Sequence, residues 1–97
     1  MKRDTALSIL KEQRQELKDR FGVSSLYLFG SVARDEAQPE SDVDLLVEFE
    51  KTIGLLEFIE LQQTLESYLG CKVDLGTKRS IKISLKENVM LEAILVV

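Results

Sequence analysis

Asp42 and Asp44 stand two residues apart at the start of an apolar run that continues to Val47. In a β-strand, residues two apart share a face, so this pattern places both carboxylates on one side and Val43, Leu45 and Val47 on the other. Aspartate is uncommon in strands, and two carboxylates about 6 to 7 Å apart repel each other unless a cation lies between them. The pair therefore indicates a site for a divalent metal ion. Magnesium prefers oxygen ligands and is usually held by one or two carboxylates together with substrate phosphates.

Gly30 and Ser31 interrupt the apolar stretch that ends at Phe29, and Ser31 precedes Asp42 by eleven residues. Glycine can adopt a backbone conformation that is closed to other residues, which lets a strand turn tightly into a short helix. Backbone N–H groups and a hydroxyl at such a turn can bind phosphate. Combined with the two aspartates, Gly30 and Ser31 predict a site for a metal ion and a nucleoside triphosphate.

A third carboxylate, Asp74, lies in a predicted strand from Cys71 to Leu75, on the side opposite the apolar residues. Two magnesium ions about 4 Å apart, bridged by carboxylates, can both neutralise a triphosphate and activate an attacking hydroxyl. We expect Asp42 and Asp44 to ligate the metal ions. We expect Asp74 to contact the catalytic metal and to be able to take the proton of the acceptor hydroxyl.

Each of these residues also has a simpler interpretation. Asp42 can be a turn residue at the start of a strand, and Asp44 and Asp74 can be exposed strand residues. Arg34 can form an ion pair with a nearby glutamate, or it can contact phosphate or the carboxylates. The combination of Gly-Ser, Asp-x-Asp and a third aspartate favours a functional site over these single-residue interpretations.

The remaining segments must position these residues. Thr5 to Phe21 has an apolar stripe that predicts one helix, ended by Gly22. Leu55 to Leu69 is the clearest helix, ended by Gly70, and its predicted core face is broad: Leu55, Leu56, Phe58, Ile59, Leu61, Leu65, Tyr68 and Leu69. A further helix is predicted from about Ser84 to Ala93, followed by an apolar tail, Ile94 to Val97, which either packs on the sheet or meets a partner; we favour packing.

Strands are predicted over Val23–Phe29 and Asp42–Phe49, besides the one that contains Asp74. The first two must be antiparallel if Ser31 and Asp42 share a site, and the helix at 55–69 is the usual connection between parallel neighbours. We therefore predict an α/β (α+β) fold, a small mixed sheet of three or four strands flanked by helices, in one domain spanning residues 1–97.

Composition narrows the function. The chain has 97 residues, 44% hydrophobic and 31% charged, with a net charge of −4, no histidine and one cysteine, Cys71. This excludes an internal disulfide, a zinc site and histidine-dependent catalysis, and it argues against a general nucleic-acid-binding surface. No segment is apolar enough to span a membrane and no signal-peptide core follows Met1, so we expect a cytoplasmic protein.

The segments Gly30-Ser31-Val32-Ala33-Arg34 and Ser41-Asp42-Val43-Asp44-Leu45-Leu46-Val47 resemble the GSxAR and SDxDLxV signature of the minimal nucleotidyltransferase (MNT) family, in the DNA polymerase β-like superfamily. The resemblance extends over nearly the whole chain. It implies the polymerase β-like fold, the same roles for Asp42, Asp44 and Asp74, and a contact of Arg34 with phosphate or the carboxylates. Asp35 departs from the pattern, since members often have glycine there, and Gly76 stands where an apolar residue is common.

The resemblance implies an antitoxin that uses ATP and magnesium to place AMP on a tyrosine of a helical HEPN-domain toxin, with which it would form a hetero-oligomer. Gly30 and Ser31 would hold the β- and γ-phosphates. An alternative is a non-catalytic antitoxin that neutralises its partner by direct occlusion, using its apolar tail. A nucleotidyltransferase acting on small molecules is disfavoured, because such enzymes resemble longer chains with added substrate domains.

Overall fold

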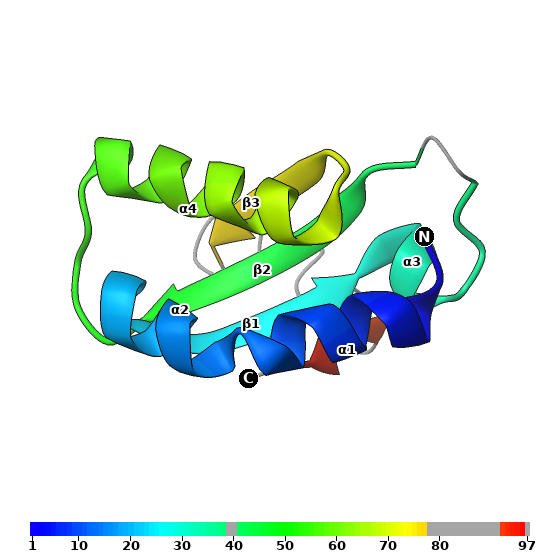
Figure 1. The fold of residues 1–97 in the computed structure, drawn as a ribbon, viewed down its shortest axis with the longest axis horizontal. Helices are drawn as coiled ribbons and strands as arrows, with labels where there is room; N and C mark the ends of the chain where they lie inside the picture. Colours follow the sequence, from blue (N-terminus) through cyan, green and yellow to red (C-terminus); the bar gives the residue numbers. More distant parts are fainter. Residues whose placement is uncertain (39–40, 78–91, 97) are drawn as a thin grey trace.

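The computed structural model describes residues 1–38, 41–77 and 92–96 (Figure 1). The elements in chain order are α1 (Arg3–Glu12), α2 (Arg14–Phe21), β1 (Val23–Phe29), α3 (Gly30–Ala33), β2 (Val43–Phe49), α4 (Leu55–Leu69), β3 (Val73–Thr77) and β4 (Ile94–Leu95). The helix predicted from about Ser84 to Ala93 lies almost wholly outside the described residues. None of the helices in the described ranges is long and apolar enough to cross a membrane.

The four strands form one mixed sheet in the order β3-β2-β1-β4. β1 and β2 are antiparallel, and β2 and β3 are parallel, as the sequence predicts. The fourth strand is the apolar tail, which pairs antiparallel with β1 and places Leu95 opposite Tyr27. Val96 is buried, and its N–H donates to the carbonyl oxygen of Leu26 at 2.7 Å. The prediction that the tail packs on the sheet is therefore confirmed for Ile94 to Val96.

One face of the sheet forms the core with the long helices. α1 and α2 run along β1, and α4 runs along β2 and β3 (Figure 1). The residues that face these helices are buried at every second position in β2 and β3, as the alternation of side chains in a strand requires. In β1 a register shift between Val23 and Ser25 places the buried residues Val23 and Leu26 three positions apart. The fully buried large side chains are Leu10, Leu17, Leu26, Leu28, Leu45, Leu61, Leu65, Val23, Val32, Val43 and Val47.

The single helix predicted for Thr5 to Phe21 is wrong in one respect, because the structure has two helices that meet at Gln13. The Gln13 N–H bonds to the carbonyl of Leu10, three residues back, which tightens the last turn of α1. No glycine or proline marks this position. The two halves pack on different elements, α1 against α3 and α4 and α2 against β1, so the break follows from tertiary packing.

α4 has the predicted bounds, and Gly70 ends it in the left-handed conformation, with φ of 69°. Its predicted apolar face is only partly correct. Leu61, Leu65 and Leu69 are buried, whereas Leu55, Leu56 and Ile59 are exposed. β3 begins two residues later than predicted and includes Gly76, because the chain first crosses to the register in which Val73 pairs with Val43.

Candidate active site

Phe29, Asp44 and Asp74 form a row across three adjacent strands. Phe29 is the register partner of Asp44 on β1, and Asp74 is its partner on β3. Register partners share a face of the sheet and neighbouring strands lie about 4.8 Å apart, so the two carboxylates project side by side. Val43 and Leu45, which flank Asp44, are buried on the helix-covered face. The aspartates therefore project from the opposite face.

Gly30 directly follows β1 and lies against Asp44. Its φ is +74°, in the left-handed region that only glycine adopts readily. A Cβ atom built on Gly30 would overlap the Asp44 carboxyl group, at 3.0 Å from Cγ and closer still to Oδ2. Both the backbone angle and the contact require glycine here, so the turn after β1 and the start of β2 form one compact structure.

Asp44 is the carboxylate most affected by its surroundings. Partial burial raises its pKa, and the negative charges of Asp74 and Asp42 raise it further, while the guanidinium of Arg34 opposes them. The ionised form of Asp44 is therefore disfavoured by desolvation and by two like charges. A divalent cation beside these carboxylates would relieve the repulsion, which is the physical basis on which the donor set fits magnesium.

Asp42 lies just before β2 and is exposed. The Val43 N–H bonds to the Lys72 carbonyl at 3.0 Å and joins this point to the start of β3. Within the described residues, no three Asp, Glu, Cys or His side chains are grouped tightly enough to hold a metal ion by themselves. The arrangement suits magnesium that is shared with substrate phosphates, since magnesium seldom uses an all-protein cage.

Arg34 forms two ion pairs with glutamates. Its Nε donates to Glu36 at 3.3 Å and its Nη1 to Glu92 at 3.0 Å, and the bonds to Glu36 and then Glu92 raise the pKa of Arg34. The ion-pair interpretation of Arg34 is thus observed, although its charge also acts on Asp44. Ser31 is half-buried in the first turn of α3, and its carbonyl accepts the Glu36 N–H at 2.8 Å. Binding of a nucleotide by either residue stays a prediction.

Asp35 stands where members of the family often have glycine. It has a φ of 58°, so this position does require the left-handed conformation. Aspartate tolerates that conformation better than most residues. Its Oδ1 also accepts the backbone N–H of Arg3 at 3.2 Å, which ties the turn to the first residue of α1.

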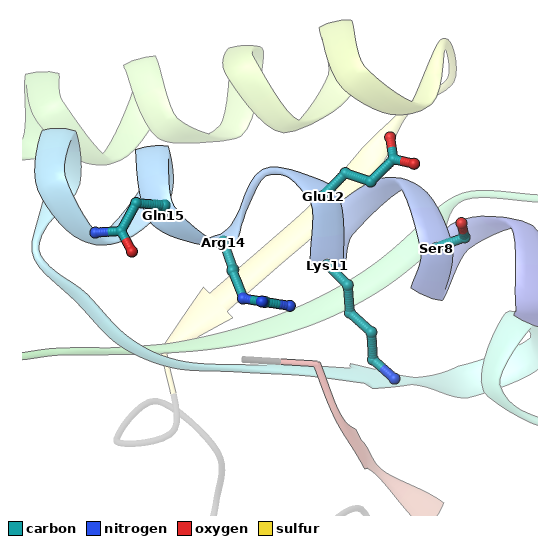
Figure 2. Close-up of a pocket in the computed structure, with 5 residues that line it drawn as sticks. All are labelled: Ser8, Lys11, Glu12, Arg14 and Gln15. Atoms are coloured by element: carbon teal, nitrogen blue, oxygen red, sulfur yellow. The ribbon is translucent and has the colours of Figure 1, made fainter.

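A surface groove of about 510 Å³ lies where α1 meets α2 (Figure 2). Its lining consists of exposed polar and charged side chains, with Lys11 and Arg14 on one side and Glu12 pointing toward α4. Neither the aspartates nor Gly30 and Ser31 line it. The groove is therefore separate from the carboxylate row.

Phe29 is the site neighbour that the sequence did not single out. It is half-buried, and as the register partner of Asp44 it lies on the same face of the sheet as the carboxylates. The feature of the sequence that could have identified Phe29 is its position directly before Gly30. Only the register between β1 and β2 shows which residue of β1 faces the pair.

A mixed sheet with helices on one face, two carboxylates paired across β2 and β3, and a glycine turn beside them define a nucleotidyltransferase type of protein. The sequence from residue 10 to 96 matches the nucleotidyltransferase domain family. The chain belongs to that family. The predicted family and fold are thereby confirmed.

Among its relatives is protein adenylyltransferase MntA of Thermococcus cleftensis, which is 47% identical over 89 residues, covering 92% of this chain and 90% of the relative. A solved chain assigned to the minimal nucleotidyltransferases superposes with a TM-score of 0.81 at 41% identity, covering 97% of this chain and 95% of the other.

Two solved toxin–antitoxin complexes are also similar. One was crystallised with AMP-PNP, with a TM-score of 0.73 and 27% identity, covering 90% of this chain and 72% of the other. The second is a tri-AMPylated HEPN toxin of Shewanella oneidensis in complex with MNT antitoxin. It has a TM-score of 0.66 and 25% identity, covering 94% of this chain and 71% of the other.

Proposed function

We propose that this protein transfers AMP from ATP to a tyrosine hydroxyl of a HEPN-type toxin and thereby acts as its antitoxin. The observation that carries the proposal is the Asp44–Asp74 pair, with Asp42 nearby and Gly30 in contact with Asp44. The names of the relatives support it: one is a protein adenylyltransferase, and one solved complex contains an AMPylated HEPN toxin with an MNT antitoxin.

The proposed reaction is an in-line displacement at the α-phosphorus of ATP. The tyrosine oxygen forms a bond to that phosphorus, the bond from phosphorus to the oxygen that bridges to the β-phosphate breaks, and pyrophosphate leaves. Asp74 is the proposed acceptor of the phenolic proton, because it is exposed and stands beside Asp44. Gly30 and Ser31 would place the β- and γ-phosphates at the turn, and Arg34 would contact phosphate.

Asp42, Asp44 and Asp74 are the residues that would hold magnesium. When bound, magnesium neutralises charge on the triphosphate and stabilises the attacking and leaving oxygens. The protein's own part is to hold the carboxylates fixed. The buried flanks Val43 and Leu45 hold β2 in place, and the absence of a side chain at Gly30 leaves the space that the Asp44 carboxyl group occupies.

The test is transfer of label from α-labelled ATP to a HEPN-type toxin offered as the partner, with magnesium present. Wild type is expected to label the partner, and mass spectrometry should locate AMP on tyrosine. Asp42→Asn and Asp44→Asn should each abolish transfer, while Asp19→Asn, an exposed aspartate on α2, should not. Label transfer that survives the Asp42→Asn/Asp44→Asn double substitution would refute the proposal.

Neutralisation by occlusion predicts a different result, because a variant without the three aspartates would still protect cells from the toxin. The sequence offers the apolar tail as the surface that would occlude the partner. In the structure the tail does not serve this role, because Ile94 to Val96 belong to the sheet and Val96 is buried. The exposed leucines of α4 do favour a surface that binds a partner. Co-expression of the toxin with the triple aspartate-to-asparagine variant separates the two functions.

A further inference from the structure

The first half of α4 exposes large apolar side chains. Leu55 is 74% exposed, Leu56 82% and Ile59 40%, although all three belong to the apolar face that the sequence predicts to be core. On a helix, these positions lie together on the side away from Leu61 and Leu65, which are fully buried. A cluster of exposed apolar residues marks an interaction site in many soluble proteins. We call Leu55, Leu56 and Ile59 the α4 patch.

The surroundings of the α4 patch are acidic. α4 contains three glutamates and no lysine or arginine, and from Glu48 to Glu66 the chain has five glutamates against one lysine. Glu60 is paired with Arg20 of α2. Glu57, in contrast, forms no ion pair with any residue in the described parts of the chain. A surface that complements this patch would combine apolar side chains with lysine or arginine.

A second copy of this chain is a poor occupant. A two-fold symmetric contact would place the patch against itself and bring the acidic α4 helices of both copies together, which is repulsive. The exposed cations Lys11, Arg14 and Lys18 of α1 and α2 could face the patch of another copy. That contact is head-to-tail, and it would build an open chain unless its rotation happened to close a ring.

The α4 patch lies at the opposite end of β2 from the aspartates. Phe58 of α4 packs edge-on against Phe49, the last residue of β2, with ring centroids 6.4 Å apart. Asp44 is five residues earlier on the same strand, so the two points are separated by about 16 Å along β2. Figure 1 shows the start of α4 and the start of β2 at opposite ends of the molecule. Since α4 covers one face of the sheet and Asp44 and Asp74 project from the other, a partner that contacts both must extend around the edge of the sheet.

We infer that the α4 patch is a docking surface for the folded protein acceptor, which meets it with a basic and apolar surface of its own. The patch holds the acceptor at a point remote from the carboxylates and so raises its effective concentration at the site. The inference rests on the proposed function in one respect, that the partner is the HEPN-type protein that receives AMP.

The test compares wild type with the double variant Leu55→Glu/Leu56→Glu in binding and modifying the HEPN-type toxin used to test the proposed function. Glutamate at the first two positions of a helix suits the helix dipole, so α4 should still form, and circular dichroism checks this. We expect the Kd for the partner and the KM for its modification to rise at least roughly tenfold, with kcat little changed. Modification of a short peptide carrying the acceptor tyrosine should be equal for both proteins.

Two variants serve as matched controls. Gln63→Glu adds a negative charge on the exposed side of the same helix without removing a leucine. Leu95→Glu replaces another exposed leucine, 56% exposed, on β4 at the far edge of the sheet. Leu95→Glu should not alter the Kd for the partner by more than about twofold, because Leu95 does not belong to the α4 patch. Gln63 lies one turn beyond Ile59 on the same side of α4, so Gln63→Glu shows how much of the effect added charge alone produces.

An unchanged Kd in the Leu55→Glu/Leu56→Glu variant would overturn the inference. So would a wild-type dimer in sedimentation that the same variant dissociates, since the occupant would then be a second copy. If binding weakens as expected but wild type transfers no AMP, the docking surface stands and the proposed function fails. If the variant modifies the folded partner as efficiently as wild type, the proposed function stands and the docking surface fails.

Discussion

Gly30 and Asp44 are in such close contact that a single methyl group on Gly30 would collide with the Asp44 carboxyl group. The contact joins the turn after β1 to the start of β2, two segments that are separated by the loop before Asp42. A phosphate-binding turn and a metal-binding carboxylate must be neighbours if one triphosphate is to meet both. This pair of residues brings them together.

Gly30→Ala should destabilise the protein and abolish activity. Alanine at a φ of +74° costs about 1 to 2 kcal/mol, and displacing Asp44 costs more. Gly70→Ala is the matched control, because Gly70 has a φ of +69° but open space around its Cβ position. Urea denaturation should show a larger loss of unfolding free energy for Gly30→Ala than for Gly70→Ala. Equal losses would mean that the contact with Asp44 has no energetic consequence.

Asp44→Asn should raise the melting temperature at neutral pH while reducing AMP transfer roughly 100-fold or more. The pKa of Asp44 is raised by burial and by Asp74 and Asp42, so its carboxyl favours folding when protonated, and that stabilisation is lost as pH rises through the raised pKa. Asparagine removes the charge at every pH.

The advantage of Asp44→Asn should therefore shrink as pH falls through the raised pKa of Asp44, because the wild-type carboxyl group then becomes protonated. Calorimetry from pH 3 to 7 measures the difference between the two proteins. Glu12→Gln, at an exposed position on α1, should show no such pH-dependent advantage. A destabilised Asp44→Asn variant at neutral pH would contradict the electrostatic account.

Magnesium should stabilise the wild-type protein, because a bound cation removes the repulsion among Asp42, Asp44 and Asp74. At ten times the dissociation constant the gain is about 1.4 kcal/mol. For a domain of this size, each 1 kcal/mol corresponds to a shift of about 4 to 8 °C in Tm. Differential scanning fluorimetry should show this shift for wild type and none for Asp42→Asn/Asp44→Asn. An equal shift in wild type and in the double variant would mean that magnesium binds at a site other than these carboxylates.

Arg34→Gln should raise the pKa of Asp44 further, because the guanidinium is the charge that favours ionised Asp44. Carboxyl-carbon NMR titration can follow Asp44 directly in both proteins. Arg14→Gln, on α2, removes an equal charge that does not act on Asp44 and should leave the titration curve unchanged. If Arg34→Gln also leaves the titration curve of Asp44 unchanged, Glu36 and Glu92 fully cancel the effect of the Arg34 charge on Asp44.

Tyr68→Phe should lower the unfolding free energy by about 1 kcal/mol or less, since the Tyr68 hydroxyl donates to Glu16 at 2.8 Å and joins α4 to α2 at the surface. Burial, followed by the bond to Glu16 and its charge, raises the pKa of Tyr68 to about 12. The stabilisation that the protonated Tyr68 hydroxyl contributes is present below the ordinary phenol pKa and is lost as pH rises through about 12. Chemical denaturation at pH 8 and pH 11.5 should show the difference between the two proteins narrowing. A constant difference would exclude the ionisation of Tyr68 as its source.

The sequence by itself determined the order of the main elements, the direction of the first three strands and the two aspartates that meet in the carboxylate row. Local rules suffice for these features: alternation in Asp42 to Leu45, the left-handed glycines at the ends of α2 and α4, and the crossover through α4 that makes β2 and β3 parallel.

Only the tertiary structure decided which apolar side chains are buried, where the first helix breaks and which strand the tail joins. Leu55 and Leu61 are both leucines of α4, yet Leu55 is exposed and Leu61 is fully buried, because burial depends on what packs opposite each position. The break at Gln13 and the pairing of Ile94 with Leu28 likewise depend on contacts between distant segments, which periodicity along the chain does not encode.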